Sequence, residues 1–143
     1  MDTHWFPLLI QRWNGKADEA ALESFCATVD GAARRARLEN TSYATVVLSA
    51  TQADVDGTQR RRLARWVRST PPELRERNAG VYIVIASPMQ RGTISALRWL
   101  VPEMKDVFGA ENVDAALAAA LAALADRGAQ VSGTPAEIRS YIG

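Results

Sequence analysis

The sequence is poor in the residues that build most catalytic and metal centres. Among its 143 residues it holds one cysteine, Cys26, and one histidine, His4. One cysteine excludes a disulfide within the chain, and one histidine excludes a metal centre with several histidine ligands. A Ser-His-Asp arrangement has no support beyond His4 itself. These scarcities weaken most enzyme interpretations, and we predict no metal site.

Long apolar runs and glycine-rich loops are also missing. The longest apolar stretch, residues 113–125, is interrupted by Asp114 and is too short to span a bilayer. We therefore predict no transmembrane segment, and the N-terminus shows no secretory pattern of basic and then apolar residues. No glycine-rich phosphate-binding motif follows an apolar strand, so no nucleotide or other cofactor is expected. A cytoplasmic location, where cysteine stays reduced, fits this chain.

What the chain does contain is an alternation of short strand-like runs and longer amphipathic segments. The apolar runs predict strands at residues 6–13, 43–50, 80–86 and 106–108. The periodic segments predict helices at residues 18–38, 58–70 and 112–127, another that begins after Ser87, and a short one after Thr134. This order predicts a single-domain α/β sandwich with about four mostly parallel strands covered by helices. We assign residues 1–127 to the domain and residues 128–143 to a C-terminal tail with a short helix.

Positive charge is concentrated in the middle of the chain. Residues 55–99 carry nine arginines and three acidic residues, a net charge of +6, whereas the whole chain carries +1. The predicted second helix places Arg61, Arg65 and Arg68 on the face opposite its apolar residues. Such a face suits an acidic protein, an anionic lipid or a nucleic acid. Because Trp66 falls on the apolar face, no aromatic residue is interleaved with the arginines, so we favour a protein partner and expect no nucleic acid.

The cysteine and the tryptophans are predicted to have packing roles. Cys26 lies on the apolar face of the first predicted helix, where burial keeps a thiol unreactive. We expect all four tryptophans in the core because their rings are costly to expose. Trp99 lies slightly off the apolar stripe of its helix, which leaves a place at the rim or in a homo-oligomer interface open.

A polar loop follows the second predicted strand and contains Asp54 and Asp56. We interpret this pair as a solvated turn that caps the next helix, because the loop lacks the run of Asp and Asn residues of a calcium site. An enzyme that uses Ser49, Thr51, Asp54 or Asp56 is a third interpretation. It lacks histidine, lysine and metal partners, so we expect no enzymatic activity.

Two segments of the chain carry a family resemblance. The apolar strand YATVVLSA precedes a polar loop and a helix that opens at Asp56-Gly57-Thr58-Gln59. The third strand leads into SPMQRGTISALRWL, a short strand at Val107-Phe108 and a helix that begins ENVDAALAAAL. In this order of elements, residues 6–125 resemble the SpoIIAA-like fold of STAS domains, the bacterial anti-sigma factor antagonists and their relatives.

The resemblance implies a function and a means of regulation. STAS domains are typically non-enzymatic, bind a regulatory protein, and in many cases are switched by phosphorylation where the helix after this strand begins. Their motif there is Asp, two Ser/Thr and Gly. In this chain Gly57 replaces the first Ser/Thr and Gln59 replaces the glycine, which leaves Thr58 as phosphoacceptor or simply as an N-cap. A phosphate on Thr58 would lie beside a helix N-terminus and several arginines.

We therefore predict a non-catalytic, cytoplasmic, STAS-like module that works by contact with a regulatory protein. The alternative is a small-molecule or lipid-binding module of the same fold, and a homo-oligomer is left open. The carboxyl ends of parallel strands lie at one edge of a sheet, where α/β folds usually place their sites. The predicted partner-binding residues are Ser49, Thr51, Asp54, Asp56, Thr58, Arg61, Arg65, Arg68 and Ser87.

Overall fold

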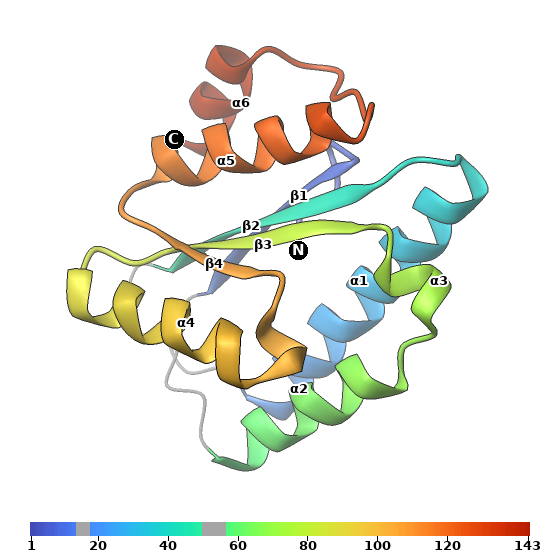
Figure 1. Ribbon diagram of the computed structural model, residues 1–143. Helices are drawn as coiled ribbons and strands as arrows, with labels where there is room; N and C mark the ends of the chain where they lie inside the picture. The colour runs from blue at the N-terminus through green and yellow to red at the C-terminus, as the bar shows by residue number, and fades with distance from the viewer. Residues whose placement is uncertain (14–17, 50–56) are drawn as a thin grey trace.

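The chain is built around one parallel sheet, which Figure 1 shows in the computed structural model. The structure describes residues 1–13, 18–49 and 57–143, without the side chains of Ser49 and Gly57. Within these residues four strands lie side by side in sequence order, and neighbouring strands are parallel. They are β1 (Leu8–Trp13), β2 (Tyr43–Ser49), β3 (Asn78–Val84) and β4 (Val107–Ala110). The predicted α/β class and four-stranded parallel sheet are confirmed.

Side-chain caps set the starts of four helices. Asp18, Ser87, Asn112 and Thr134 each accept a hydrogen bond from the backbone N–H three residues ahead, at 2.8 to 3.3 Å. The helices are α1 (Glu19–Leu38), α2 (Gly57–Ser69), α3 (Pro72–Arg75), α4 (Pro88–Leu100), the 3-10 helix η1 (Pro102–Met104), α5 (Val113–Asp126) and α6 (Pro135–Ile142).

The sequential strand order determines which helices cover which face. Each step between neighbouring parallel strands needs a crossover, and crossovers of one hand all pass over the same face of the sheet. Figure 1 shows α1 to α4 on that face, below the strands in the view. Because α5 follows the last strand, it has no further strand to reach, and it lies with α6 on the opposite face.

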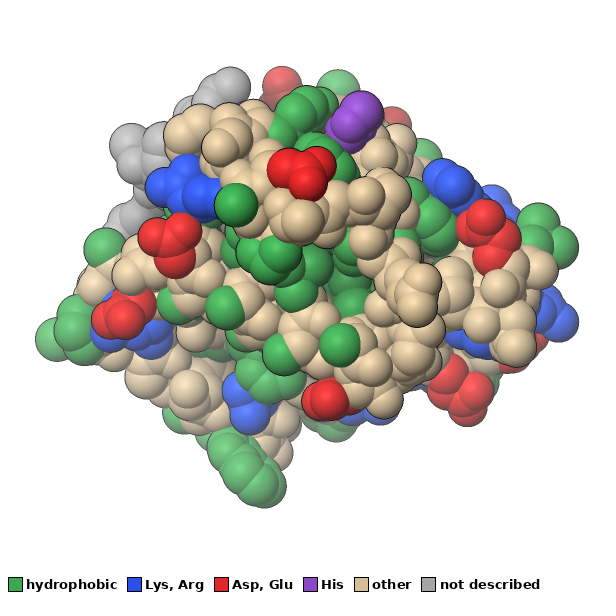
Figure 2. All heavy atoms as spheres, turned by 90° about the horizontal axis from the view of Figure 1, so that it is seen from above, with side chains coloured by type: hydrophobic (Ala, Val, Ile, Leu, Met, Phe, Trp, Pro, Cys, Tyr) green, Lys and Arg blue, Asp and Glu red, His purple; other side chains and the backbone are tan. Residues whose placement is uncertain are grey.

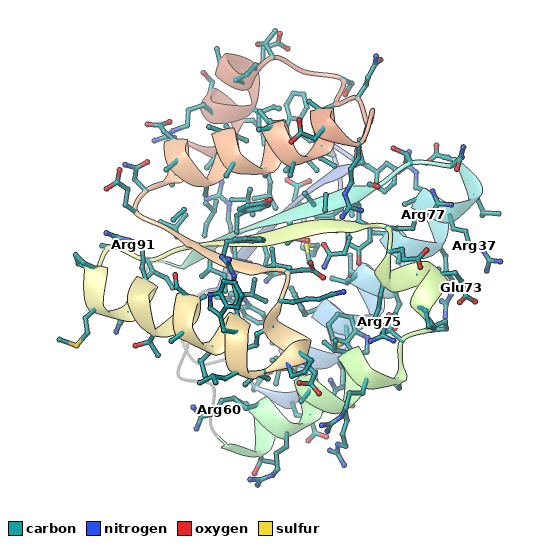
Figure 3. The ribbon with its side chains drawn as sticks, viewed as in Figure 1. Arg37, Arg60, Glu73, Arg75, Arg77 and Arg91 are labelled. Atoms are coloured by element: carbon teal, nitrogen blue, oxygen red, sulfur yellow. The ribbon has the colours of Figure 1, made fainter. Side chains whose placement is uncertain are left out.

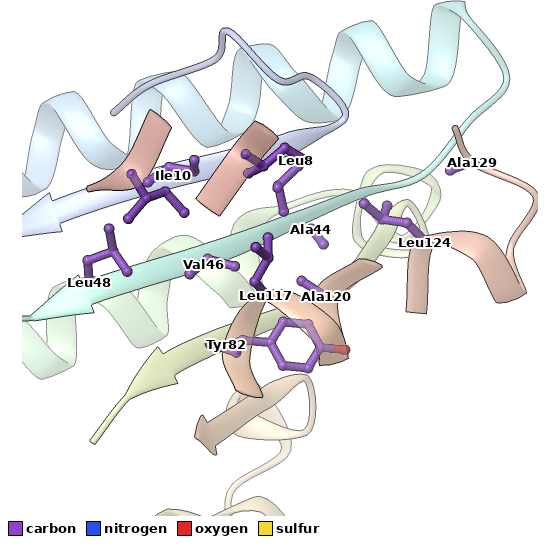
Figure 4. Close-up of a cluster of buried hydrophobic side chains, with 13 residues drawn as sticks. Leu8, Ile10, Ala44, Val46, Leu48, Tyr82, Leu117, Ala120, Leu124 and Ala129 are labelled. Carbon is purple, nitrogen blue, oxygen red and sulfur yellow. The ribbon is translucent and has the colours of Figure 1, made fainter. Parts of the chain in front are cut away.

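The main core lies between the sheet and the pair α5 and α6 (Figure 4). Leu8, Val46, Leu117, Leu124 and Ile138 are at most 3% exposed there. The small side chains of the alanine-rich α5 let this helix pack closely on β2 and β3. Because Ile138 belongs to α6, the C-terminal tail contributes to the same core as the strands.

The other face of the sheet is packed unevenly. Leu9 of β1 is buried together with Val29 and Ala33 of α1. No described residue of α2 or α4 is fully buried, although the apolar spacing of both helices predicted core positions. Half-buried apolar residues on these elements are Leu63 and Val67 of α2, Ile94 and Leu97 of α4, and Val81 and Ile83 of β3. We call these six residues the half-buried layer; all of them stay more accessible than the core on the α5 side of the sheet.

The expectation that all four tryptophans pack in the core is wrong for Trp99. Trp5, Trp13 and Trp66 are half-buried, whereas Trp99 is 86% exposed. The physical reason is the orientation of α4, which turns Ile94 and Leu97 toward the sheet and so directs Trp99 away from it. Cys26 is buried, as predicted.

The face formed by α5 and α6 carries charges of both signs, as Figure 2 shows. An apolar hollow opens between the two helices, beside an ion pair between Asp114 and Arg139 at 2.8 Å. Its apolar lining consists of Leu117, Ala118, Leu121, Pro135 and Ala136. Acidic and basic side chains therefore compensate one another on this side of the molecule.

Candidate functional site

The exposed side of α2 carries a row of arginines. Arg61, Arg65 and Arg68 follow one another at intervals of four and three residues, which places them on one side of the helix, and all three are exposed. Thr58 lies one turn earlier on the same side, and Arg61 Nη2 donates a hydrogen bond to Thr58 Oγ1 at 3.5 Å. We call these four residues the α2 arginine row. The structure thus brings four of the predicted partner-binding residues together.

The charge of this row is largely uncompensated. Neither α2 nor α4 contains an acidic residue, while the two helices together carry seven arginines. Arg68 pairs with Glu103 of η1 at 3.3 Å, but the described residues offer Arg61 and Arg65 no carboxylate within ion-pair distance. Arg60, labelled near the start of α2 in Figure 3, adds another exposed guanidinium. Such a row attracts acidic surfaces, and salt screens the attraction.

Polar contacts hold α2 against α1. Trp66 Nε1 donates a hydrogen bond to Asp30 Oδ1 at 3.0 Å, and Arg62 Nη1 donates to Cys26 Sγ at 3.3 Å. Cys26 and Asp30 are four residues apart on α1, as Arg62 and Trp66 are on α2, so each pair lies on one side of its helix. We call these four residues the α1–α2 seam. The seam therefore joins α2 to α1 through two hydrogen bonds, in a helix with no fully buried described residue.

Cys26 belongs to this seam as a packing group. Burial raises the pKa of its thiol, and the hydrogen bond and positive charge of Arg62 lower that pKa by a smaller amount. The thiol is therefore protonated at neutral pH, and it acts as a hydrogen-bond acceptor for Arg62 rather than as a nucleophile. Arg62 in turn points to α1 and takes no part in the α2 arginine row.

Two predicted roles at helix starts have different outcomes. Ser87 is half-buried, and its hydroxyl accepts a hydrogen bond from Gln90 N at 3.3 Å, so it serves as the N-cap of α4. Thr58 lies inside α2, which begins at Gly57. Because an N-cap residue precedes the first helical residue, the N-cap alternative for Thr58 is wrong. Its hydroxyl is instead part of the exposed side of α2.

The remaining predicted residues fall at the end of β2 and beyond it. Ser49 is the last residue of β2, and its side chain is outside the described residues. Thr51, Asp54 and Asp56 lie outside them altogether. The described part of the predicted surface therefore consists of the α2 arginine row and Ser87.

Sequence reasoning missed the seam and the outer side of α4. The sequence groups Arg62 with the other arginines of a basic helical face, whereas in the structure it contacts Cys26 of α1. No sequence signal says that α1 and α2 pack against each other. On α4, Met89 and Leu100 are 82% and 77% exposed. Their separation of about three helical turns places them on one side of the helix, which is a signal that the sequence does contain.

No family model, curated protein or solved structure matches this chain. Over residues 1–13, 18–49 and 57–143, no helix is long and apolar enough to cross a membrane. Across the same residues, no group of three or more His, Cys, Asp or Glu side chains is placed to hold a metal ion. A functional assignment must therefore rest on the geometry and charge of the site itself.

The seam gives a prediction for the attachment of α2. Trp66→Phe removes the indole N–H and leaves the Asp30 carboxylate without this donor. We expect the free energy of unfolding to fall by about 1–2 kcal/mol, and the amides of α2 to exchange hydrogen faster while those of α5 change little. Hydrogen–deuterium exchange with mass spectrometry measures both helices.

Asp30→Asn is the matched control, because it removes the charge but keeps an oxygen that accepts from Trp66. Its effect on α2 exchange should be clearly smaller than that of Trp66→Phe. Equal acceleration of exchange in α2 and α5 would show that the seam does not act locally.

Proposed function

We propose that this protein is a non-catalytic interaction module that binds an acidic surface of a regulatory protein. The observation that carries the proposal is the α2 arginine row, in which Arg61 and Arg65 are exposed without a carboxylate partner among the described residues. The row lies on a helix that contains no acidic residue. A partner that supplies carboxylates would complete ion pairs that the described residues do not make with Arg61 and Arg65.

The choice of arginine favours carboxylates on a folded partner. Fifteen of the seventeen basic residues in the chain are arginines. The planar guanidinium donates two parallel hydrogen bonds to a carboxylate, so it recognises position and orientation as well as charge. Successive members of the row lie about one helical turn apart, or roughly 5–6 Å. An acidic protein surface with carboxylates at similar intervals fits such a row.

The proposed module is STAS-like and cytoplasmic, and phosphorylation of Thr58 regulates it. The order of elements, with a helix after each of the four strands, supports the STAS-like assignment. Support for Thr58 comes from its exposure and from the Arg61 guanidinium at 3.5 Å. A phosphate on Thr58 would pair with Arg61 and add negative charge to the row, so it would weaken binding of an acidic partner.

Charge reversal on α2 tests the proposed contact. With Arg61→Glu/Arg65→Glu, like charges would face the acidic partner, and we expect its affinity to fall about tenfold or more. The wild-type chain and the variant are compared as baits in cell extract, and the affinity of the captured protein is then measured at low and high salt. Binding by the wild-type chain should weaken as salt rises.

Arg34→Glu/Arg37→Glu is the matched control, since both arginines are exposed on α1 and the change in charge is the same. The partner should bind this control like the wild-type chain. Retention of the partner by Arg61→Glu/Arg65→Glu would rule out the α2 arginine row as its contact.

The proposed regulation has its own test. Thr58→Glu places a carboxylate beside Arg61, and we expect several-fold weaker binding of the acidic partner. Thr58→Val, which removes the hydroxyl without adding charge, should bind as the wild-type chain does. Isothermal titration calorimetry with the captured partner measures both. Equal affinities for the glutamate and valine variants would remove the basis for a phosphate switch at this residue.

A second candidate function is a small-molecule or lipid-binding module. The observation that favours it is the half-buried layer on α2, β3 and α4, whose six apolar residues stay partly accessible. A flexible apolar ligand would gain hydrophobic contact there. Native mass spectrometry of the purified chain tests this function: we expect added mass from a co-purified ligand, and a bare chain after gentle purification would count against it.

A further inference from the structure

The outer side of α4 is apolar and exposed along its whole length. Met89, Trp99 and Leu100 are 82%, 86% and 77% exposed, and they share this side with the exposed residues Gly92 and Ala96. The intervals of three, four and four residues between Met89, Gly92, Ala96 and Leu100 are those of one helical face. We call these five residues the α4 apolar row. Single exposed apolar residues are ordinary on a protein surface, but an aligned set of large ones is typical of a binding site.

No charge interrupts the α4 apolar row. Arg91, labelled at the start of α4 in Figure 3, donates from Nη1 to the backbone oxygens of Ile85 and Ala86 at 2.9 and 2.8 Å. The guanidinium of Arg98 lies 4.2 Å from the centre of the Phe108 ring. Both arginines of α4 are thus turned toward strand segments, and the outer side of the helix is free for apolar contact.

Gly92 leaves room for the close approach of another backbone. A Cβ atom at this position would meet nothing within 4 Å, so no contact inside the described chain requires a glycine there. Glycine is nevertheless a poor residue for the interior of a helix. Gly92 and Ala96, about one turn apart, add little side-chain volume to this side of α4. The helix backbone is therefore accessible between Met89 at one end and Trp99 with Leu100 at the other. A helix laid across this stretch would contact the α4 backbone closely and pack its own apolar side chains against the large residues at the ends.

The positive charge of α2 favours another protein over a second copy of this chain as the occupant of the α4 apolar row. Arg68 of α2 is paired with Glu103 of η1, which directly follows α4, so the α2 arginine row and the α4 apolar row belong to one layer of the molecule (Figure 1). Two copies joined through α4 would bring together two such layers, each with the exposed Arg60, Arg61 and Arg65 and no acid on α2 and α4. Like charges disfavour that pairing, whereas carboxylates beside an apolar face complement both rows.

We infer that α4 provides the apolar half of the docking surface, and that its occupant is an amphipathic helix of the acidic partner. The apolar side of that helix lies on the α4 apolar row and its carboxylates face the α2 arginine row. This inference rests on the proposed function and adds the secondary structure and polarity of the partner segment. It makes Trp99 and Leu100 the large apolar anchors of the contact.

Site-specific photo-cross-linking tests which segment covers α4. A photoreactive amino acid replaces Ala96 in the full chain, or Ala27 as a control at another exposed alanine within a helix. After irradiation in cell extract, mass spectrometry identifies the cross-linked peptide. We expect position 96 to mark a helical segment with apolar residues on one side and acidic residues on the other, and position 27 to give no such product. A product with a second copy of this chain, with a loop or strand, or with lipid would overturn the inference, as would no product at all.

Affinity for a defined probe gives an independent measurement. The probe is a synthetic peptide helix with leucine along one face and glutamate along the other, compared with a peptide of the same composition in scrambled order. We expect about tenfold or more tighter binding of the patterned peptide, and loss of that preference in Gly92→Leu. Gly31→Leu is the matched control, because a Cβ at Gly31 also meets nothing within 4 Å and Gly31 is exposed on α1. Circular dichroism confirms that both variants are folded.

Variants on α2 and on α4 separate the arginine contact from the α4 contact. If Arg61→Glu/Arg65→Glu loses the captured partner while Gly92→Leu and Trp99→Ser keep it, the α4 assignment is wrong and the arginine contact stands. If the charge reversal also keeps the partner, both are wrong. Leu38→Ser is the matched control for Leu100→Ser, because Leu38 on α1 is also an exposed leucine, at 87%. Binding of the wild-type chain to vesicles of phosphatidylcholine and phosphatidylglycerol, lost in Trp99→Ser, would assign the surface to a membrane instead.

Discussion

The sequential parallel order of the strands is the constraint on which the rest of the molecule depends. Since each strand pairs with the next one along the chain, the connecting helices must lie on one face of the sheet. Only α5 and α6, which follow the last strand, are free to cover the other face, and the most completely buried core is found there. The connecting helices divide the first face among them, and α1 alone buries a continuous set of residues. The molecule therefore has a densely packed side and a loosely packed side.

The loosely packed side is also where charge and exposed apolar residues collect. The side of α2 that faces α1 is bound by hydrogen bonds, and another side of this helix carries exposed arginines. The inner side of α4 is half-buried and its outer side is apolar. In an isolated domain, such an arrangement leaves hydrophobic contact and ion pairing unused. A partner that covers both helices would bury the apolar residues and pair the charges at the same time, and this combination underlies the proposed contact.

Most of the fold could be predicted from local sequence because local physics determines it. The apolar run of β2 and the alanine-rich stretch of α5 have the length and period of their elements. Ser87 and Thr134 act as N-caps through their own neighbouring backbone. For the same reason the row formed by Arg61, Arg65 and Arg68 was visible: its members share one side of one helix.

What could not be predicted depends on how separate elements meet. The hydrogen bond between Trp66 and Asp30 joins two helices whose relative position no single-helix pattern encodes. The exposure of Trp99 follows from the orientation of α4, which turns Ile94 and Leu97 inward, and hydrophobicity alone does not reveal that orientation. Helical spacing predicted that Leu63, Ile94 and Leu97 lie on the inner sides of their helices. It did not predict how much of each side chain stays accessible. Burial depends on the neighbours that a residue acquires in three dimensions.

The segment before β1 protects one edge of the sheet. Asp2 exchanges two backbone hydrogen bonds with Ile10, at 2.8 and 3.0 Å, and its carboxylate accepts a hydrogen bond from the Tyr141 hydroxyl of α6 at 2.6 Å. The first residues are thereby tied both to the edge strand and to the last helix. A foreign strand that paired beside Ile10 would first have to displace them. Extension of the sheet by another chain is therefore disfavoured at this edge.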